Sequence, residues 1–96
     1  MDFKRIWKTM LMRWFGVRDP NYEYWVRTDE IHVPYLYTKA KIRKAKWERK
    51  LKYWYETGKF ESKILIDKDF RLVDGYSSQK IAHVNGVKYV PVYFVD

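Results

Sequence analysis

The stretch "LVDGYSSQKIAHVNG", from Leu72 to Gly86, decides the fold of this chain. An apolar strand runs into Asp74-Gly75, where glycine permits a sharp turn with a positive φ angle. A helix N-cap is then expected at Ser77 or Ser78, and Asn85-Gly86 ends that helix. Such a corner is either a plain strand-to-helix connection or a phosphate-binding turn, because free N–H groups at a helix start attract anions.

The composition describes a small basic protein that is rich in aromatic side chains. Its 96 residues make one domain, and 20 Lys and Arg against 12 Asp and Glu give a net charge of +8. That excess favours anionic partners such as nucleic acid or an acidic protein face. The sequence has no cysteine, which excludes disulfides and a cysteine nucleophile and fits a reducing compartment, so we expect a cytoplasmic protein. No apolar run approaches the roughly 20 residues that cross a bilayer.

Residues 2–15 are predicted to form an amphipathic helix that begins at Asp2 and stops at Gly16. The apolar stripe of this helix consists of Phe3, Ile6, Trp7, Met10, Leu11 and Trp14. Basic amphipathic helices bind membranes or partner proteins. An apolar stripe more commonly packs on its own domain, so we expect that packing here and expect no membrane partner. We assign residues 1–28 to this helix and a connector, and residues 29–96 to the compact domain.

Residues 24–38 are predicted to form an extended strand, with Pro34 marking an edge or an end. Ile31 and Val33 alternate around His32, so the His32 side chain is expected to point away from their face. No catalytic role is assigned to His32.

A second helix is predicted from residue 39, with Gly58 as its C-terminal stop. Its apolar stripe consists of Trp47, Leu51, Trp54 and Tyr55. Its cations are the candidate contacts to a nucleic acid or another anionic partner, and they are Lys39, Lys41, Arg43, Lys44, Lys46, Arg49, Lys50 and Lys52. These side chains either form a solvated face or follow a phosphate backbone.

The pattern changes to β after residue 62. Strands are predicted at residues 63–67, 70–75 and 88–96, and the helix that opens at the two serines lies before the last of them. The order of elements predicts an α+β fold in which helices pack on a small mixed sheet.

These pieces, taken together, resemble the ParB/sulfiredoxin-like domain. That family shows a helix ending in glycine, a strand, a hairpin into a glycine corner, a helix, and a closing strand with Val-Pro-Val. The matching residues are Gly58, Ile64-Leu65-Ile66, Leu72-Val73-Asp74-Gly75, Ala82, Gly86 and Val90-Pro91-Val92. Residues 29–46 are similar to the family's first strand and the start of its first helix. The resemblance therefore covers residues 29–96, and the N-terminal helix is an addition.

In nucleotide-using relatives this corner binds phosphate groups, and arginines just after the glycine help. In this chain those arginines are absent. If the nearby Lys80 faces the corner, it is expected to substitute for them in part. The candidate residual phosphate corner consists of Asp74, Gly75, Tyr76, Ser77, Ser78 and Lys80. Sulfiredoxin chemistry needs a cysteine in this region, so the sequence excludes that activity, and no cofactor is expected.

A metal site at the hairpin is not predicted. Asp67, Asp69 and Asp74 surround the hairpin, and carboxylates of this kind hold Mg²⁺ in other proteins. Asp is also the ordinary residue of turns, and a turn is expected at residues 67–69.

The sequence supports three functions, of which we favour the first. The first is a non-enzymatic basic binding protein with a ParB-like fold, acting on nucleic acid or within a nucleic-acid-handling complex. The second is a phage or mobile-element protein that inhibits a protein partner, such as a CRISPR effector or another nucleic-acid enzyme. The third is a nucleotide-binding or phosphoryl-transfer enzyme that uses the Gly75 corner. A homodimer, if formed, is expected to use Tyr93, Phe94 and the N-terminal stripe.

Overall fold

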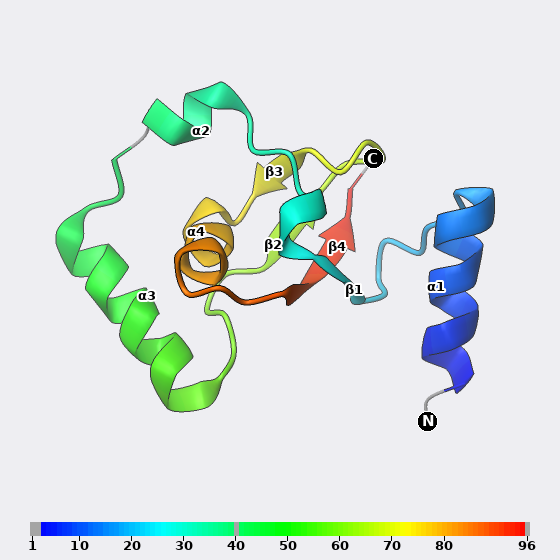
Figure 1. Ribbon diagram of the computed structural model, residues 1–96, viewed down its shortest axis with the longest axis horizontal. Helices are drawn as coiled ribbons and strands as arrows, with labels where there is room; N and C mark the ends of the chain where they lie inside the picture. Colours follow the sequence, from blue (N-terminus) through cyan, green and yellow to red (C-terminus); the bar gives the residue numbers. More distant parts are fainter. Residues whose placement is uncertain (1–2, 40, 96) are drawn as a thin grey trace.

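The computed structural model describes residues 3–39 and 41–95, so the predicted N-cap Asp2 lies outside the described residues. The elements are α1 (Phe3–Phe15), β1 (Tyr24–Arg27), the 3-10 helix η1 (Thr28–Glu30), α2 (Tyr35–Lys39), α3 (Lys44–Thr57), β2 (Ile64–Ile66), β3 (Leu72–Asp74), α4 (Tyr76–Val84) and β4 (Tyr89–Phe94). The predicted α+β class, with helices around a small mixed sheet, is confirmed (Figure 1).

The four strands form one sheet in the order β1-β4-β2-β3. Strand β4 is antiparallel to β1 and parallel to β2, and β2 is antiparallel to β3. Strand β1 lies within residues 1–28, the range assigned above to the N-terminal helix and connector, and it pairs with β4. The sheet therefore draws on both parts of the predicted division of the chain.

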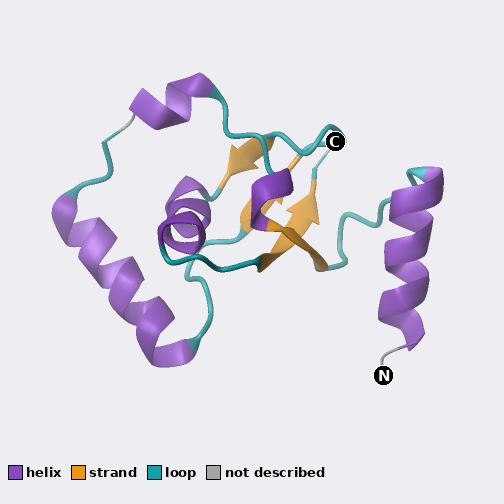
Figure 2. Ribbon diagram, in the orientation of Figure 1, coloured by secondary structure: helices purple, strands orange, loops and turns teal. Residues whose placement is uncertain are grey.

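The core lies between one face of the sheet and α4. In β4, Val90, Val92 and Phe94 are buried, and the residues between them face outward, as the period of two in a strand requires. Burying a valine or isoleucine side chain completely contributes about 1.5–3 kcal/mol, so these strands supply much of the stability. Helix α4 lies between α3 and the sheet, and α1 and α3 lie at opposite ends of the longest axis (Figures 1 and 2).

The strand predicted over residues 24–38 ends early, at Arg27, and the chain continues as η1 and α2. The segment at His32 instead makes an isolated parallel bridge to Arg71 beside β3. His32 N–H donates to the Phe70 carbonyl at 2.8 Å, and the His32 side chain is exposed while Ile31 is buried. The alternation at His32 is thus confirmed, although the long strand is wrong.

The prediction of a helix beginning at residue 39 is also wrong. Helix α2 ends at Lys39 and α3 begins at Lys44, after Arg43 in an extended conformation with ψ 137°. The first turn of α3 contains no acidic residue. Cations crowded at a helix N-terminus oppose the helix dipole, which disfavours continuous helix through this segment. The predicted stop at Gly58 is present, with φ 72°.

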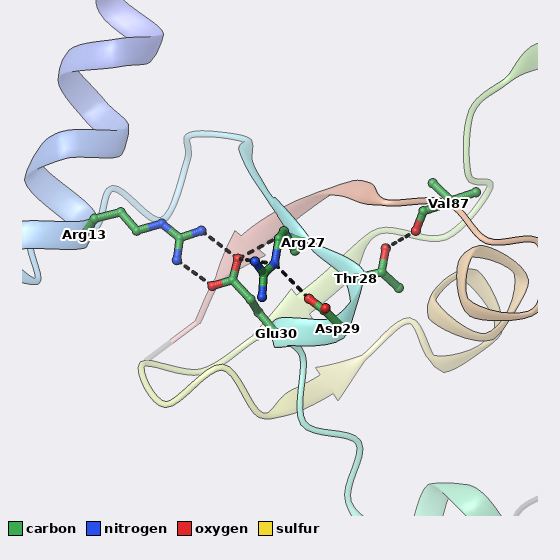
Figure 3. A network of polar contacts seen from close by, with 6 residues as sticks. All are labelled: Arg13, Arg27, Thr28, Asp29, Glu30 and Val87. Atoms are coloured by element: carbon green, nitrogen blue, oxygen red, sulfur yellow. Dashed lines mark hydrogen bonds and ion pairs between the residues drawn. The ribbon is translucent and has the colours of Figure 1, made fainter.

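Helix α1 contacts the domain through its basic side, so the expectation that its apolar stripe packs on the domain is wrong. The buried residue of α1 is Met12, which is not part of the stripe. The Arg13 guanidinium donates two hydrogen bonds to the Glu30 carboxylate, at 2.5 and 3.0 Å (Figure 3). Lys8 Nζ donates to Asp19 at 2.9 Å. Carboxylates on the domain therefore attract the basic side of the helix. Of the stripe, Phe3, Ile6, Trp7 and Trp14 are exposed, and Met10 and Leu11 are half-buried.

Gly75→Ala is expected to destabilise the protein more than Gly58→Ala. Both glycines have positive φ, +85° and +72°, so alanine at either position introduces left-handed strain of about 1–2 kcal/mol. At Gly75 a Cβ would also lie 2.2 Å from the Lys63 carbonyl oxygen, whereas nothing lies within 4 Å at Gly58. We expect a loss of about 3 kcal/mol or more for Gly75→Ala, measured by urea unfolding. Equal losses for the two variants would contradict this account.

Candidate anion-binding cleft

A cleft of about 870 Å³ opens between α3, β2 and the start of α4. It is lined by Tyr37, Lys41, Ile42, Arg43, Lys46, Lys50, Ser62, Lys63, Leu65, Asp74, Gly75, Tyr76 and Ser77, and we call it the basic cleft. Its lysines and arginine outnumber the Asp74 carboxylate, so the cleft attracts anions. The basic helix and the glycine corner, predicted as separate candidates, thus meet in one place.

The corner of the cleft is built on Gly75, which is the N-cap of α4 and has no side-chain capping bond. The prediction that Ser77 or Ser78 caps the helix is therefore wrong, because α4 starts at Tyr76 and both serines fall within its first turn. Ser78 Oγ instead donates to the Ser62 carbonyl at 2.7 Å, which ties α4 to the chain entering β2. The helix start keeps its free N–H groups at the edge of the cleft.

Lys50 supplies a cation at this corner from the far side of the cleft. Only 7% of Lys50 is exposed, and it is the buried residue of α3. Its Nζ donates to the Ser62 hydroxyl and, at 3.2 Å, to the Ser77 hydroxyl. Burial, followed by the nearby Lys46 charge, lowers the pKa of Lys50 below its ordinary value. A bound anion would oppose this shift, because a negative charge beside the ammonium group favours its charged form.

Two tyrosine rings form an aromatic edge of the cleft. The Tyr37 and Tyr76 ring centroids are 5.4 Å apart, and the Tyr37 hydroxyl donates to the Val73 carbonyl at 2.5 Å. This hydrogen bond holds α2 against β3. Lys80 lies over the rings of Tyr76 and Trp47, at 6.0 and 5.5 Å from their centroids.

The structure divides the predicted basic contacts into two groups. Those that line the basic cleft are Lys41, Arg43, Lys46 and Lys50, and those that do not are Lys39, Lys44, Arg49 and Lys52. In the second group, Lys44 lies 3.9 Å from Glu48, Lys52 lies 3.8 Å from Glu56, and Arg49 lies 3.3 Å from Glu61. Lys39 lies over the Tyr35 ring. Of the predicted phosphate corner, the residues Asp74, Gly75, Tyr76 and Ser77 line the cleft, while Ser78 and Lys80 do not.

Sequence reasoning missed Lys63 and Tyr37 as cleft residues. Lys63 immediately precedes β2, so the close approach of that strand to Gly75 carries it to the corner. Lys63 could have been predicted as a cleft residue, because it stands just before the strand that leads into the hairpin ending at Gly75. No local pattern marks Tyr37, because its place depends on the unpredicted helix α2.

Outside the cleft, the structure also bears on metal, membrane and self-association sites. Among residues 3–39 and 41–95, no cluster of three or more His, Asp or Glu side chains is arranged to hold a metal ion. Within the same ranges, no helix is both long and apolar enough to cross a membrane.

Phe94 is 3% exposed and belongs to the core, so its assignment to a self-association surface is wrong. The Tyr93 hydroxyl donates to Glu23 at 3.1 Å.

Comparison with solved structures settles the architecture. A Pnob8-like ParB-N domain superimposes with a TM-score of 0.66 over 78% of this chain, at 20% sequence identity. This chain has a ParB-N-like fold. The fold that the resemblance implied is confirmed, in divergent form, and the chain spans 30% of the length of that solved chain. No protein-family model matches the sequence, and no curated protein matches it.

The buried charge of Lys50 is expected to make stability rise with pH. Its folded-state pKa lies below the ordinary value of 10.5, so between the two values the unfolded chain binds more protons than the folded one. The destabilisation is complete below the folded pKa and is relieved as pH rises toward 10.5. As pH rises toward 10.5, the unfolding free energy of the wild type should therefore increase relative to that of Lys50→Met.

Lys52→Met serves as the control, since Lys52 is exposed on the same helix. Denaturant unfolding at a series of pH values measures both differences. If the difference in unfolding free energy between the wild type and Lys50→Met stays constant with pH, the prediction is contradicted.

Proposed function

We propose that this protein is a non-enzymatic module that binds nucleic acid, with phosphate groups of the backbone held in the basic cleft. The observation that carries the proposal is the meeting of the α3 cations with the start of α4 at Gly75. Phosphate is recognised by helix N-termini and by lysine and arginine side chains, and the cleft brings these groups together.

The placement of charge supports phosphate as the ligand group. Arg43 and Lys46 are exposed side chains that line the cleft, and Lys50 lies at its base beside Ser77. An ammonium group has three N–H donors, and Lys50 directs two of them to serine hydroxyls. In this proposal the third donor and the Ser77 hydroxyl hydrogen are directed to a phosphate oxygen.

A binding role is favoured over catalysis by the chemistry of the lining. Asp74 accepts a hydrogen bond from the Gly75 N–H at 2.8 Å, which gives this carboxylate a structural use at the turn. The Ser77 hydroxyl accepts a hydrogen bond from the Lys50 ammonium group, which in that charged form has no lone pair to take the proton of a serine nucleophile. Neither histidine belongs to the described lining of the cleft.

Nucleic-acid binding should depend on the cleft cations and not on equal charges elsewhere on α3. The double variant Arg43→Ala/Lys46→Ala removes two lining cations, whereas Lys44→Ala/Lys52→Ala removes two cations outside the lining. Each lost phosphate contact lowers the slope of log affinity against log salt by about one. We expect the first variant to lose about two units of slope and the second to stay near the wild type.

Fluorescence anisotropy with single- and double-stranded oligonucleotides over a salt series measures these slopes. Circular dichroism checks that both variants are folded. The same loss in both variants, or an affinity of the wild type that does not change with salt, would contradict a defined site in the cleft.

A single nucleotide is the second candidate ligand, and one observation favours it. The buried Lys50 and the α4 start converge on one point, which suits a compact phosphate chain more than an extended track. The cleft volume of about 870 Å³ lies within the range of small-molecule sites.

Thermal unfolding with CTP or ATP and Mg²⁺ tests this candidate. A nucleotide at 100 times its dissociation constant should stabilise the fold by about 2.7 kcal/mol, and Lys50→Met should abolish that effect. Lys52→Met should retain it. No shift at millimolar nucleotide would leave the nucleic-acid backbone as the proposed ligand.

A further inference from the structure

The face of the sheet that points away from the core is rich in aromatic side chains. In β4, Tyr89 and Tyr93 alternate with buried valines, and the strand register places Trp25 of β1 opposite Pro91. Trp25 is 40% exposed and Tyr89 50%. Positions on the solvent side of a strand are usually polar, so exposed rings in this place indicate a binding surface.

These rings line a second cleft, of about 840 Å³. Residues of the segment that joins α3 to β2 also line it. The Trp54 and Phe60 rings lie nearly parallel there, with an interplanar angle of 15° and centroids 6.4 Å apart. We call this the aromatic cleft, and its rings, with one proline, are Trp25, Trp54, Phe60, Tyr89, Pro91 and Tyr93.

The aromatic cleft is balanced in charge, unlike the basic cleft. Among the described residues that line it, Glu23 and Glu61 stand against Lys59 and Lys63. Arg49 also lies 3.3 Å from Glu61. In the basic cleft, by contrast, lysine and arginine side chains outnumber the carboxylate. The aromatic cleft therefore suits the face of a flat ring, whereas the basic cleft suits an anionic group.

The two clefts adjoin, because Ser62 and Lys63 line both of them. Lys63 Nζ lies 5.0 Å from the centroid of the Tyr93 ring, so a cation stands beside a ring where the clefts meet. A ligand that fills both clefts must carry anionic groups on one side and flat rings on the other. Single-stranded nucleic acid has this composition, and proteins that bind it combine a basic groove for the backbone with aromatic side chains on which bases stack.

A duplex and a peptide fit the two clefts less well. The bases of a duplex are stacked on one another, so only an unpaired strand offers base faces to aromatic side chains of a protein. Proline-rich peptides also dock in aromatic-lined grooves. The prolines of such a peptide would leave the basic cleft without an anion, and any lysine or arginine in it would be repelled there.

We propose that this protein binds single-stranded nucleic acid, with unpaired bases stacked in the aromatic cleft and the backbone in the basic cleft. The proposal rests on the function proposed above for the basic cleft, and it adds the strandedness of the ligand and a second contact surface. Trp25 and Tyr89 are the rings with the most exposed area for stacking.

The first test needs only the wild type. Fluorescence anisotropy compares a DNA strand of about 12 nucleotides, the same backbone with abasic sites in place of the bases, and the duplex of the same sequence. We expect the single strand to bind roughly tenfold more tightly than either of the others, because it alone offers bases for stacking.

The second test removes the exposed rings. Trp25→Thr/Tyr89→Thr replaces them with a residue that suits strands, and Trp14→Ala/Phe15→Ala is the control, since it removes two exposed rings of α1 that lie outside the described lining of both clefts. The first variant should bind the single strand about tenfold more weakly or worse, with the salt slope of the wild type, because the phosphate contacts remain. The control should bind as the wild type does, and circular dichroism checks the fold of both variants.

Failure of this proposal is distinguishable from failure of the proposed function. If Arg43→Ala/Lys46→Ala loses salt slope while the single strand, the abasic strand and the duplex bind the wild type equally, backbone binding stands and base stacking is overturned. Unchanged single-strand binding by Trp25→Thr/Tyr89→Thr, or an equal loss in the control, also overturns it. If the wild type binds none of the three DNAs, both proposals are overturned. If instead Trp25→Thr/Tyr89→Thr loses binding of a proline-rich peptide and keeps that of the single strand, the aromatic cleft is a peptide site.

Discussion

The approach of the Lys63 carbonyl to Gly75 is the constraint on which the rest of the structure depends. A side chain at position 75 would occupy the space through which the chain enters β2. Because glycine leaves that space free, the start of α4 lies against Ser62, and the two α4 serines contact Ser62 and Lys50. The close packing of α4 and the cationic floor of the cleft both follow from this one contact.

The second half of the chain was largely predictable because its signals are local. Glycine at positions 58 and 75, the alternation in β4 and the Asp-rich turn after β2 each specify a conformation within a few residues. The order of these pieces was enough to identify the ParB-N-like fold. The corner and the basic helix were found as separate candidates, since no sequence pattern reports that two surfaces face each other.

Two of the errors arise where contacts between distant segments override local patterns. The period of α1 shows where its apolar stripe lies but not which side meets the domain, and Asp19 and Glu30 decide that side. Lys50 looked like one cation among eight, yet it is the buried one, because serine hydroxyls from two other segments accept its hydrogen bonds. The spacing of apolar residues within a helix does not show which distant residues its side chains will contact.

The parallel pairing of β2 with β4 has a consequence for the order of folding. Strand β4 lies between β1 and β2 in the sheet, although it follows both of them, β3 and α4 in the chain. While the chain is being synthesised, β1 and β2 therefore have no common neighbour until residues 89–94 have left the ribosome. Strand β1 must wait unpaired until then, whereas β2 can already pair with β3, and contacts as distant in sequence as β1 with β4 form slowly. Chaperones that shield exposed strands would have their largest effect during that interval.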